Sequence, residues 1–228
     1  NVYNNLGTLY KAKNEYTKAE SYYKKSIELD KKIIEPQNNL GSLYIDQTKY
    51  EDAIICFKKC INIEPKSPIS HYNLGIANIS IGKIKDAKKH LEESINIYPQ
   101  FYKAHRAISR IKKYSKKDNH INILEDLLKN LNLANTDKIE LSFALGKAYD
   151  DIKNFDKAFS YYEIGNKLRN EDVNFKSERE ILEFELIKDF FIHCNYKKYK
   201  NKSLRLGLIL YSSVFILEKP ELIMTFST

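Results

Sequence analysis

The stretch EPQNNLGSLYIDQTKYEDAIICFKKCINIEP, residues 35–65, decides the fold of this 228-residue chain. It holds a Leu40-Gly41 pair, a small Ala53, a bulky Phe57 and a closing Pro65. The same landmarks recur 34 residues before and 34 residues after this stretch. The Leu-Gly pair recurs at Leu6-Gly7 and Leu74-Gly75, and the small alanine at Ala19 and Ala87. The bulky residue recurs as Tyr23 and Leu91, Cys60 is matched by the small Ser26 and Ser94, and Pro65 is matched by Pro99. A period of about 34 residues predicts stacked supersecondary units rather than one globular core.

The residue types predict two packed helices in each unit. Gly41 and Ala53 are small, so that two helix backbones can approach, and Phe57 fills the space between neighbouring hairpins. Pro65 lacks an amide hydrogen and disfavours helix at the preceding residue, so it ends the second helix. Cys60 takes a small-residue packing position. Packing explains it better than a zinc site with Cys56, because the histidines are scattered and zinc needs four convergent ligands.

Two further units follow the three regular ones. The unit that begins near Tyr102 is degenerate, since Ile108-Ser109 replaces Leu-Gly and Glu125 takes the place of the bulky residue. The pattern returns at Leu145-Gly146, after a short insertion. We therefore expect an all-α chain, a right-handed α-solenoid of about five helical hairpins, with units at residues 1–33, 34–67, 68–101, 102–135 and 139–172.

The sequence after the repeats predicts a capping helix over residues 175–197. Ser177 and Glu180 form a capping-box pattern, and an apolar stripe follows at Ile181, Phe184, Ile187 and Phe191. Residues 198–228 form a basic and then apolar tail. At the other end, Val2 and Tyr3 leave an apolar surface without a polar cap, which predicts further repeats upstream.

These landmarks resemble the tetratricopeptide repeat family over about residues 1–172. The resemblance implies a module for protein–protein interaction. In that family the first helix of each unit lines a concave groove, and the groove binds an extended peptide or a partner domain.

One row on the expected first helices is uniform: Asn5, Asn39 and Asn73. Each asparagine amide has a donor and an acceptor, so the row can bind a peptide backbone whatever its side chains are. The row resembles the asparagine ladder of O-linked N-acetylglucosamine transferases, which holds substrate peptide. The alternative is that these asparagines bond neighbouring repeats to each other.

A second candidate site is cationic. Lys103, Arg106, Arg110 and Lys113, with Lys117 beyond them, fall three or four residues apart, which predicts one face of a helix. The cations either bind carboxylates or phosphates of an acidic partner or form a solvated face. The carboxylate clamp of chaperone-binding tetratricopeptide domains is absent. Only Asn39 matches its pattern, and no cation stands at the clamp positions, which are occupied by Asn4, Thr8, Ile69 and Asn73.

No motif predicts catalysis. The sequence has no glycine-rich phosphate loop and no zinc-protease motif, and the adjacent His193 and Cys194 would point about 100° apart on a helix.

Residues 104–169 nevertheless resemble the repeat region of bacterial tetratricopeptide-containing sulfotransferases, particularly at 107–114 and 143–151. The phosphate-gripping loop of that family is missing after Val214–Leu217, where Glu218-Lys219-Pro220 follows. The alternative function is thus a sulfotransferase repeat region whose catalytic domain is missing or disrupted, and whether the parent protein is an enzyme stays open.

Charge, cysteine content and hydropathy indicate which class of partner and which cellular compartment to expect. The formal net charge is +8, but both signs are interspersed and lysine far outnumbers arginine, so we expect protein rather than nucleic acid to bind. Three cysteines without disulfide spacing fit a reducing cytoplasm. The apolar run 206–217 is shorter than the roughly 20 residues of a membrane span. We expect no cofactor, no metal and no small-molecule substrate in this segment.

Overall fold

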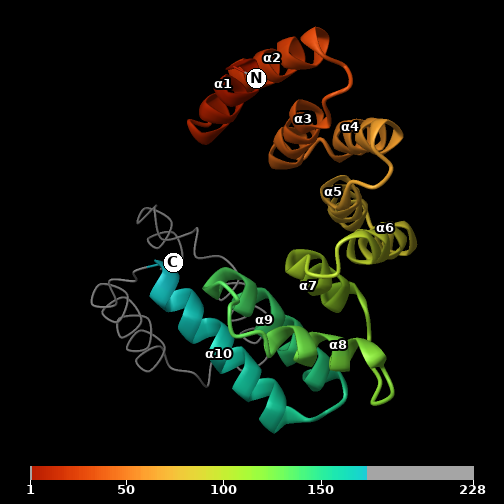
Figure 1. The fold of residues 1–228 in the computed structure, drawn as a ribbon, viewed down its shortest axis with the longest axis vertical. Coiled ribbons are helices and arrows are strands. Elements are labelled where there is room, and N and C mark those ends of the chain that lie inside the picture. The colour runs from red at the N-terminus through yellow and green to blue at the C-terminus, as the bar shows by residue number, and fades with distance from the viewer. Residues whose placement is uncertain (1, 174–228) are drawn as a thin grey trace, which may run out of the picture. The chain divides into compact units, whose positions relative to one another are not determined.

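The structure is a computed structural model that describes residues 2–173, and it folds them into ten α-helices with no strand among them (Figure 1). The helices are α1 (Val2–Ala12), α2 (Tyr16–Leu29), α3 (Ile34–Asp46), α4 (Tyr50–Ile63), α5 (Pro68–Ser80), α6 (Ile84–Ile97), α7 (Tyr102–Ile111), α8 (Asn119–Leu128), α9 (Asn135–Asp151) and α10 (Phe155–Val173). The helices α1–α2, α3–α4, α5–α6 and α9–α10 pair as hairpins. The predicted α-solenoid of helical hairpins is confirmed.

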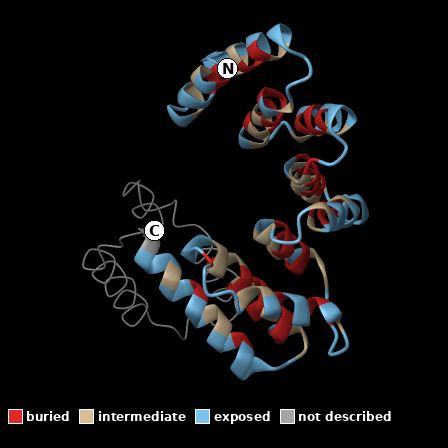
Figure 2. Ribbon diagram, viewed as in Figure 1, coloured by how far each residue is buried: buried red, intermediate tan, exposed pale blue. Residues whose placement is uncertain are grey.

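The core is a series of clusters between consecutive helices. The second helix of each hairpin packs against the first helix of the next, and the buried residues line these contacts (Figure 2). One cluster joins Tyr23 to Leu40 and Leu43, and the next joins Phe57 to Leu74 and Ala77. Each unit therefore buries its apolar face only against its neighbours, as in other solenoids.

A close contact between glycine and a bulky side chain holds each regular hairpin together. A Cβ atom built on Gly41 would lie 2.5 Å from the Phe57 ring, and one on Gly7 would lie 2.6 Å from the Tyr23 ring. Gly75 meets Leu91 and Gly146 meets Tyr162 in the same way, at 2.7 Å. The glycine is needed because a bulky side chain of the second helix occupies the space of a Cβ.

The regular hairpins also share one turn. Asn14, Thr48, Gly82 and Lys153 adopt the left-handed conformation, with φ of 60°, 59°, 76° and 61°. After Thr48, the Lys49 N–H donates to the Tyr44 carbonyl at 2.8 Å, while the Thr48 N–H donates to Ile45 at 2.9 Å. This is the Schellman pattern that ends a helix, and Asn14, Gly82 and Lys153 repeat it.

The fourth unit departs from this plan. The extensive contacts of α7 are with α6 and α9, and those of α8 are with α9. Between α7 and α8 the chain leaves the helix at Lys112, in an extended conformation. Asp151, at the end of α9, accepts the Tyr114 N–H at 2.8 Å, and Lys147 donates to the Lys112 carbonyl at 2.8 Å. The connecting segment is thus bonded to the following unit.

This connection corrects one prediction. Lys113 and Lys117 do not share a helix face with Lys103, Arg106 and Arg110, because α7 ends at Ile111. The Lys112 backbone is extended, and the Tyr114 side chain packs into the core around α9, where it is only 4% exposed.

The predicted capping helix at 175–197 and the tail at 198–228 lie outside the described residues. At the start of the array, Val2 is 72% exposed and Leu9 is 50% exposed. Further repeats upstream stay a prediction.

Candidate functional site

The asparagine row lies where three first helices meet. Asn5 is exposed, and Asn39 and Asn73 are half-buried. The Asn39 Nδ2 donates to Oδ1 of Asn4 at 2.9 Å, and the Asn73 Nδ2 donates to Oδ1 of Asn38 at 3.4 Å. These bonds join α1 to α3 and α3 to α5, so the amide nitrogens link neighbouring repeats, which was the alternative that the sequence left open.

The side-chain oxygens of Asn39 and Asn73 do not take part in the hydrogen bonds between repeats. Within residues 2–173, Oδ1 of Asn39 and Oδ1 of Asn73 accept no hydrogen bond, and the Asn5 amide makes none. Because Nδ2 is anchored, each of the two half-buried amides has a fixed orientation. The row therefore offers oriented acceptors, which suit the N–H donors of a peptide backbone.

The cationic site centres on Arg106. Its Nε lies 3.2 Å from Oε2 of Glu140, and its guanidinium lies over the Phe143 ring at 4.4 Å from the centroid. Burial lowers the pKa of Arg106, Glu140 opposes that shift, and Arg110 and Arg169 add to it. Three guanidinium groups are thus close enough to influence one another.

The other predicted cations are more exposed. Arg110 lies one turn after Arg106 on the same face of α7, and Lys103 lies at the start of that helix. Lys113 is exposed beyond the helix end. The structure thus brings Arg106 and Arg110 together and separates Lys113 from them.

Sequence reasoning missed Arg169 and Phe143. The Arg169 guanidinium lies 5.9 Å from the centroid of the same Phe143 ring, although it belongs to α10. The sequence contained one signal, because arginine is rare in it: Arg106, Arg110 and Arg169 are all the arginines of residues 2–173. In the structure these three residues lie within electrostatic range of one another.

Two histidine pairs were also missed, in which His71, His105 and His120 are buried and His90 is half-buried. Nδ1 of His71 lies 3.1 Å from Nδ1 of His90, and Nδ1 of His105 lies 2.9 Å from Nε2 of His120. In both pairs Nε2 of the first histidine faces a proline carbonyl, from Pro65 or Pro99. The signal was present in the sequence, because His71 and His105 are one repeat period apart, as are the two prolines.

One set of neutral tautomers satisfies the second pair completely. A carbonyl only accepts, so His105 donates from Nε2 to Pro99 and its Nδ1 must accept from His120. Nδ1 of His120 then accepts from the Tyr114 hydroxyl at 2.7 Å. Burial lowers the pKa of His105, and burial together with His105 lowers the pKa of His120 to about 4. The chain of hydrogen bonds is therefore a structural element of the fourth unit.

The two cysteines of α4 are packing residues. Cys60 is fully buried and its thiol donates to the Ile34 carbonyl at 3.5 Å. Ser94 makes the same bond one unit later, to the Pro68 carbonyl at 2.8 Å. Burial raises the pKa of the Cys60 thiol to about 12, so it stays protonated. The predicted packing role of Cys60 is confirmed.

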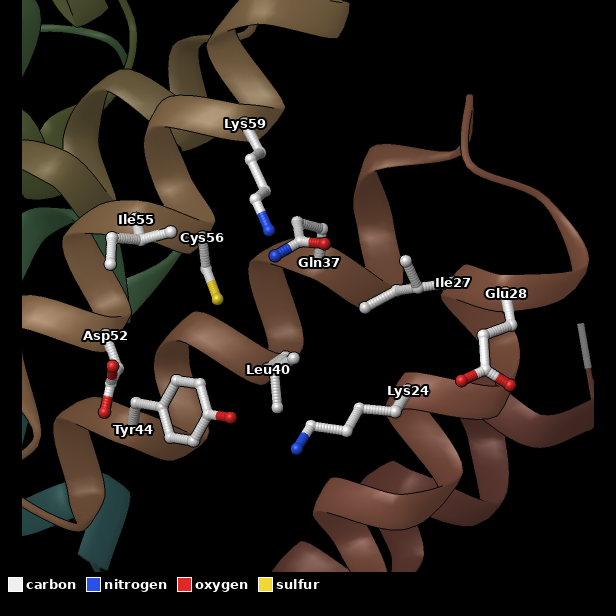
Figure 3. Close-up of a pocket in the computed structure, with 10 residues that line it drawn as sticks. All are labelled: Lys24, Ile27, Glu28, Gln37, Leu40, Tyr44, Asp52, Ile55, Cys56 and Lys59. Atoms are coloured by element: carbon white, nitrogen blue, oxygen red, sulfur yellow. The ribbon is translucent and has the colours of Figure 1, made fainter.

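A pocket of about 300 Å³ opens between α2, α3 and α4 (Figure 3). Its floor contains Leu40 and Cys56, and the Tyr44 hydroxyl beside it donates to Glu20 at 3.0 Å. Lys24 and Lys59 on its border are matched by Glu28 and Asp52. This balance of charges favours no class of ligand.

The part of the chain that the structure describes brings together no group of three metal-ligating side chains. Among the same residues, no helix is both long enough and apolar enough to cross a membrane.

Family models give the identity of these hairpins. Models described as tetratricopeptide repeat or TPR repeat match residues 1–32, 41–82, 69–101 and 139–171. The chain is a tetratricopeptide repeat protein. No matched model covers residues 102–138, where the tetratricopeptide pattern is interrupted by the extended connection between α7 and α8.

Solved structures share the tetratricopeptide fold at low identity. The crystal structure of MamA is 23% identical, covers 75% of this chain and 98% of its own, and has a TM-score of 0.56. The APC/C hetero-tetramer Cut9-Hcn1 is 19% identical over 75% of this chain and 34% of its own, with a TM-score of 0.61. YrrB, described as a TPR protein with an unusual peptide-binding site, is 18% identical over 73% and 84%, with a TM-score of 0.53.

A search of curated proteins found no match. The likeness of residues 104–169 to sulfotransferase repeat regions stays a prediction, and the tail on which the truncated catalytic domain depends lies outside the described residues.

Proposed function

We propose that the repeats bind an extended peptide or partner segment along the first-helix face that carries Asn5, Asn39 and Asn73. The observation that supports this best is the anchoring of the amides. With Nδ2 of Asn39 held by Asn4, and Nδ2 of Asn73 held by Asn38, the two side-chain oxygens are fixed acceptors one repeat apart. A backbone N–H of an extended ligand fits such an acceptor without any demand on its side chains.

The fold agrees with this function. Tetratricopeptide repeats serve many partners, so the fold alone names none. The peptide-binding site named in the description of YrrB adds support, since that protein shares the hairpin array.

Selection of a displayed library of random peptides on the full chain would test the proposal. Binding of an enriched peptide is then measured by fluorescence polarisation for the Asn39→Ala and Asn73→Ala variants. We expect each variant to weaken binding by roughly tenfold, about 1.4 kcal/mol, because a polar contact to the peptide is lost. N-methylation of the peptide amides that face the row should weaken binding similarly.

The matched control is Asn4→Ala. It removes the hydrogen bond that orients the Asn39 amide but leaves that amide in place, so we expect it to weaken peptide binding less than Asn39→Ala does. If Asn4→Ala weakens binding as much as Asn39→Ala does, the row serves only to join repeats. Failure to enrich any peptide would overturn the proposed function.

A further inference from the structure

Two of the three arginines of residues 2–173 lie over one aromatic ring, and the third is close to the first of them, although they come from two helices that are far apart in sequence. Arg106 belongs to α7 and Arg169 to α10, and both guanidinium groups lie over Phe143 of α9, at 4.4 Å and 5.9 Å from its centroid. The packing of α9 against both α7 and α10 creates this juxtaposition (Figure 1). Arg110 adds a third guanidinium one turn after Arg106.

The positive charge of this arginine cluster, Arg106, Arg110 and Arg169, is only partly compensated. Glu140 lies 3.2 Å from Nε of Arg106, and no carboxylate of residues 2–173 forms an ion pair with Arg110 or Arg169. The contact to Glu140 uses Nε, and the Nη groups of Arg106 make no hydrogen bond within the described residues. Among the described residues, one of the three guanidinium groups therefore has a carboxylate partner and the other two have none.

The surroundings make these charges effective. The Arg106 side chain is 29% exposed, so it is partly shielded from water, and the ring under its guanidinium, Phe143, packs against Tyr162 at 6.3 Å between centroids. Burial and then Glu140 raise the pKa of the Tyr72 hydroxyl while Arg110 lowers it, which puts this hydroxyl within electrostatic range of the cluster. Arg110 and Arg169 are exposed, but the partly desolvated charge of Arg106 attracts an anion more strongly than a charge on an open surface does.

The residue type is informative as well. The chain uses lysine almost everywhere for its positive charge, yet it places arginine at these three positions. A guanidinium presents a planar fork of donors that matches a carboxylate or phosphate, and it stacks on aromatic rings, which an ammonium does less well. A solvated face would not require arginine.

We infer that the arginine cluster binds an anionic group, a carboxylate or a phosphoryl group, on the peptide that the repeats capture. This inference rests on the proposed function and names the chemistry of its ligand as an acidic or phosphorylated peptide. Arg106 and Phe143 stand in phase with Asn4, Asn38 and Tyr72 on the first helices. The anionic residue would therefore lie toward the α7–α9 end of a peptide whose backbone meets the asparagine row.

The competing role of the arginines is structural. Arg110 lies in the last turn of α7, where a cation stabilises the end of a helix, and Arg106 pairs with Glu140. A structural role would change stability without changing the preference among ligands. The two roles can therefore be separated by measuring both.

The first arm of the test is a peptide array probed with the full chain, in which every peptide is present with Asp or Glu, with phosphoserine, and with the neutral Asn, Gln or Ser. We expect an anionic form to bind about tenfold more tightly than its neutral form. The Arg106→Gln, Arg110→Gln and Arg169→Gln variants should each reduce this preference, and Arg110→Lys should restore only part of it. The relative strength of carboxylate and phosphoserine forms identifies the source of the anion.

The control is Lys85→Gln on α6, which removes one exposed positive charge away from the cluster. If Lys85→Gln lowers the preference as much as the arginine variants do, the effect is a general field and the inference is wrong. If peptides bind but neutral and anionic forms bind equally, the inference fails while the proposed function stands.

The second arm does not need a peptide. Inorganic phosphate is titrated into the full chain while the arginine Nε–H signals are followed by NMR. We expect saturable shifts of the signals of Arg106, Arg110 and Arg169, which Arg106→Gln weakens and Lys85→Gln does not. Shifts that never saturate would overturn the anion site even if the array identified no ligand.

Discussion

In the second unit the Phe57 ring closes on Gly41, whereas in the fourth unit the position in phase with Phe57 holds Glu125. The Glu125 carboxylate accepts hydrogen bonds from the Tyr149 hydroxyl at 2.5 Å and the Tyr161 hydroxyl at 3.5 Å. A carboxylate cannot fill an apolar contact between two helices, so α7 and α8 lose the contact that closes a regular hairpin. Both helices instead pack against α9.

This difference teaches that the array tolerates the loss of a hairpin if the next unit compensates. The largest cluster of the described core surrounds α9, and it contains Tyr114, Leu124, Leu141 and Leu145. Tyr114 and Leu124 supply the bulk that position 125 does not. The repeat is thus interrupted locally while burial continues along the array.

The largest effect is expected at Leu124. This side chain is fully buried, and its truncation in Leu124→Ala should reduce the free energy of unfolding by about 4 kcal/mol. Glu125→Ala removes the residue at the repeat's own bulky position and should cost about 1 kcal/mol. Urea denaturation of both variants measures the difference. Equal losses would show that the packing position has not moved from 125 to 124.

The second effect is a loss of stability in acid. The pKa of His120 is lowered from its ordinary 6.5 to about 4, so the unfolded chain takes up the proton first. This contribution to stability is complete above pH 6.5 and is lost as the pH falls toward 4, by about 3 kcal/mol in all. Burial disfavours the charged form of His120 most, and His105 and Lys112 add to the lowering of its pKa. Protonation would also place an N–H against the Tyr114 hydroxyl in place of an acceptor.

Unfolding free energies at pH 7 and pH 4.5 check this effect. His120→Gln should flatten the pH dependence, because an amide can donate and accept without titrating in this range. His90→Gln is the matched control in the third unit, where the histidine is only half-buried, and should flatten it less. An unchanged pH dependence in His120→Gln would mean that other groups cause the acid loss.

The third effect separates the two kinds of unit at the glycine position. Gly41→Ala would place its Cβ against the Phe57 ring and should destabilise the chain by about 2 kcal/mol, despite the better helix propensity of alanine. At the matching position of the fourth unit, Ser109 already carries a Cβ and is buried without such a clash. Ser109→Ala deletes a hydroxyl that donates to the Arg106 carbonyl at 2.7 Å but creates no clash, so it should cost at most about 1 kcal/mol. Thermal unfolding distinguishes the two outcomes.

The same contrast explains how far the sequence predicted the structure. The regular hairpins could be predicted from residues such as Gly41 and Phe57, because their spacing places a small residue of the first helix against a bulky residue of the second. The end of α7 could not be read in this way, because Asp151 and Lys147 bond to the segment after Ile111 from a distant part of the sequence. The helical spacing of the cations predicted that the helix continues through Lys113, and the sequence carries no sign of the distant contacts that end it at Ile111.

The candidate sites divide along the same line. The row of Asn5, Asn39 and Asn73 is visible because it is periodic, but its bonding to Asn4 and Asn38 depends on how adjacent first helices pack. Arg106 and Arg110 are visible on one helix. Arg169 and Phe143 join them only through the packing of α7 and α10 on α9, and no spacing in the sequence records that.

The smallest effect concerns the turn that the fourth unit lacks. Thr48 is β-branched and holds φ at 59°, a conformation that costs such a residue free energy, whereas Asn14 occupies the same place in the first unit at φ of 60°. Thr48→Asn should therefore raise the free energy of unfolding by about 0.5–1 kcal/mol, since asparagine tolerates this region. Lys116, the residue in phase in the fourth unit, is not among the described residues with positive φ, so Lys116→Asn should change nothing. A gain at both positions would mean that asparagine acts through the unfolded chain and not through the left-handed turn, because of these two units only the second has such a turn.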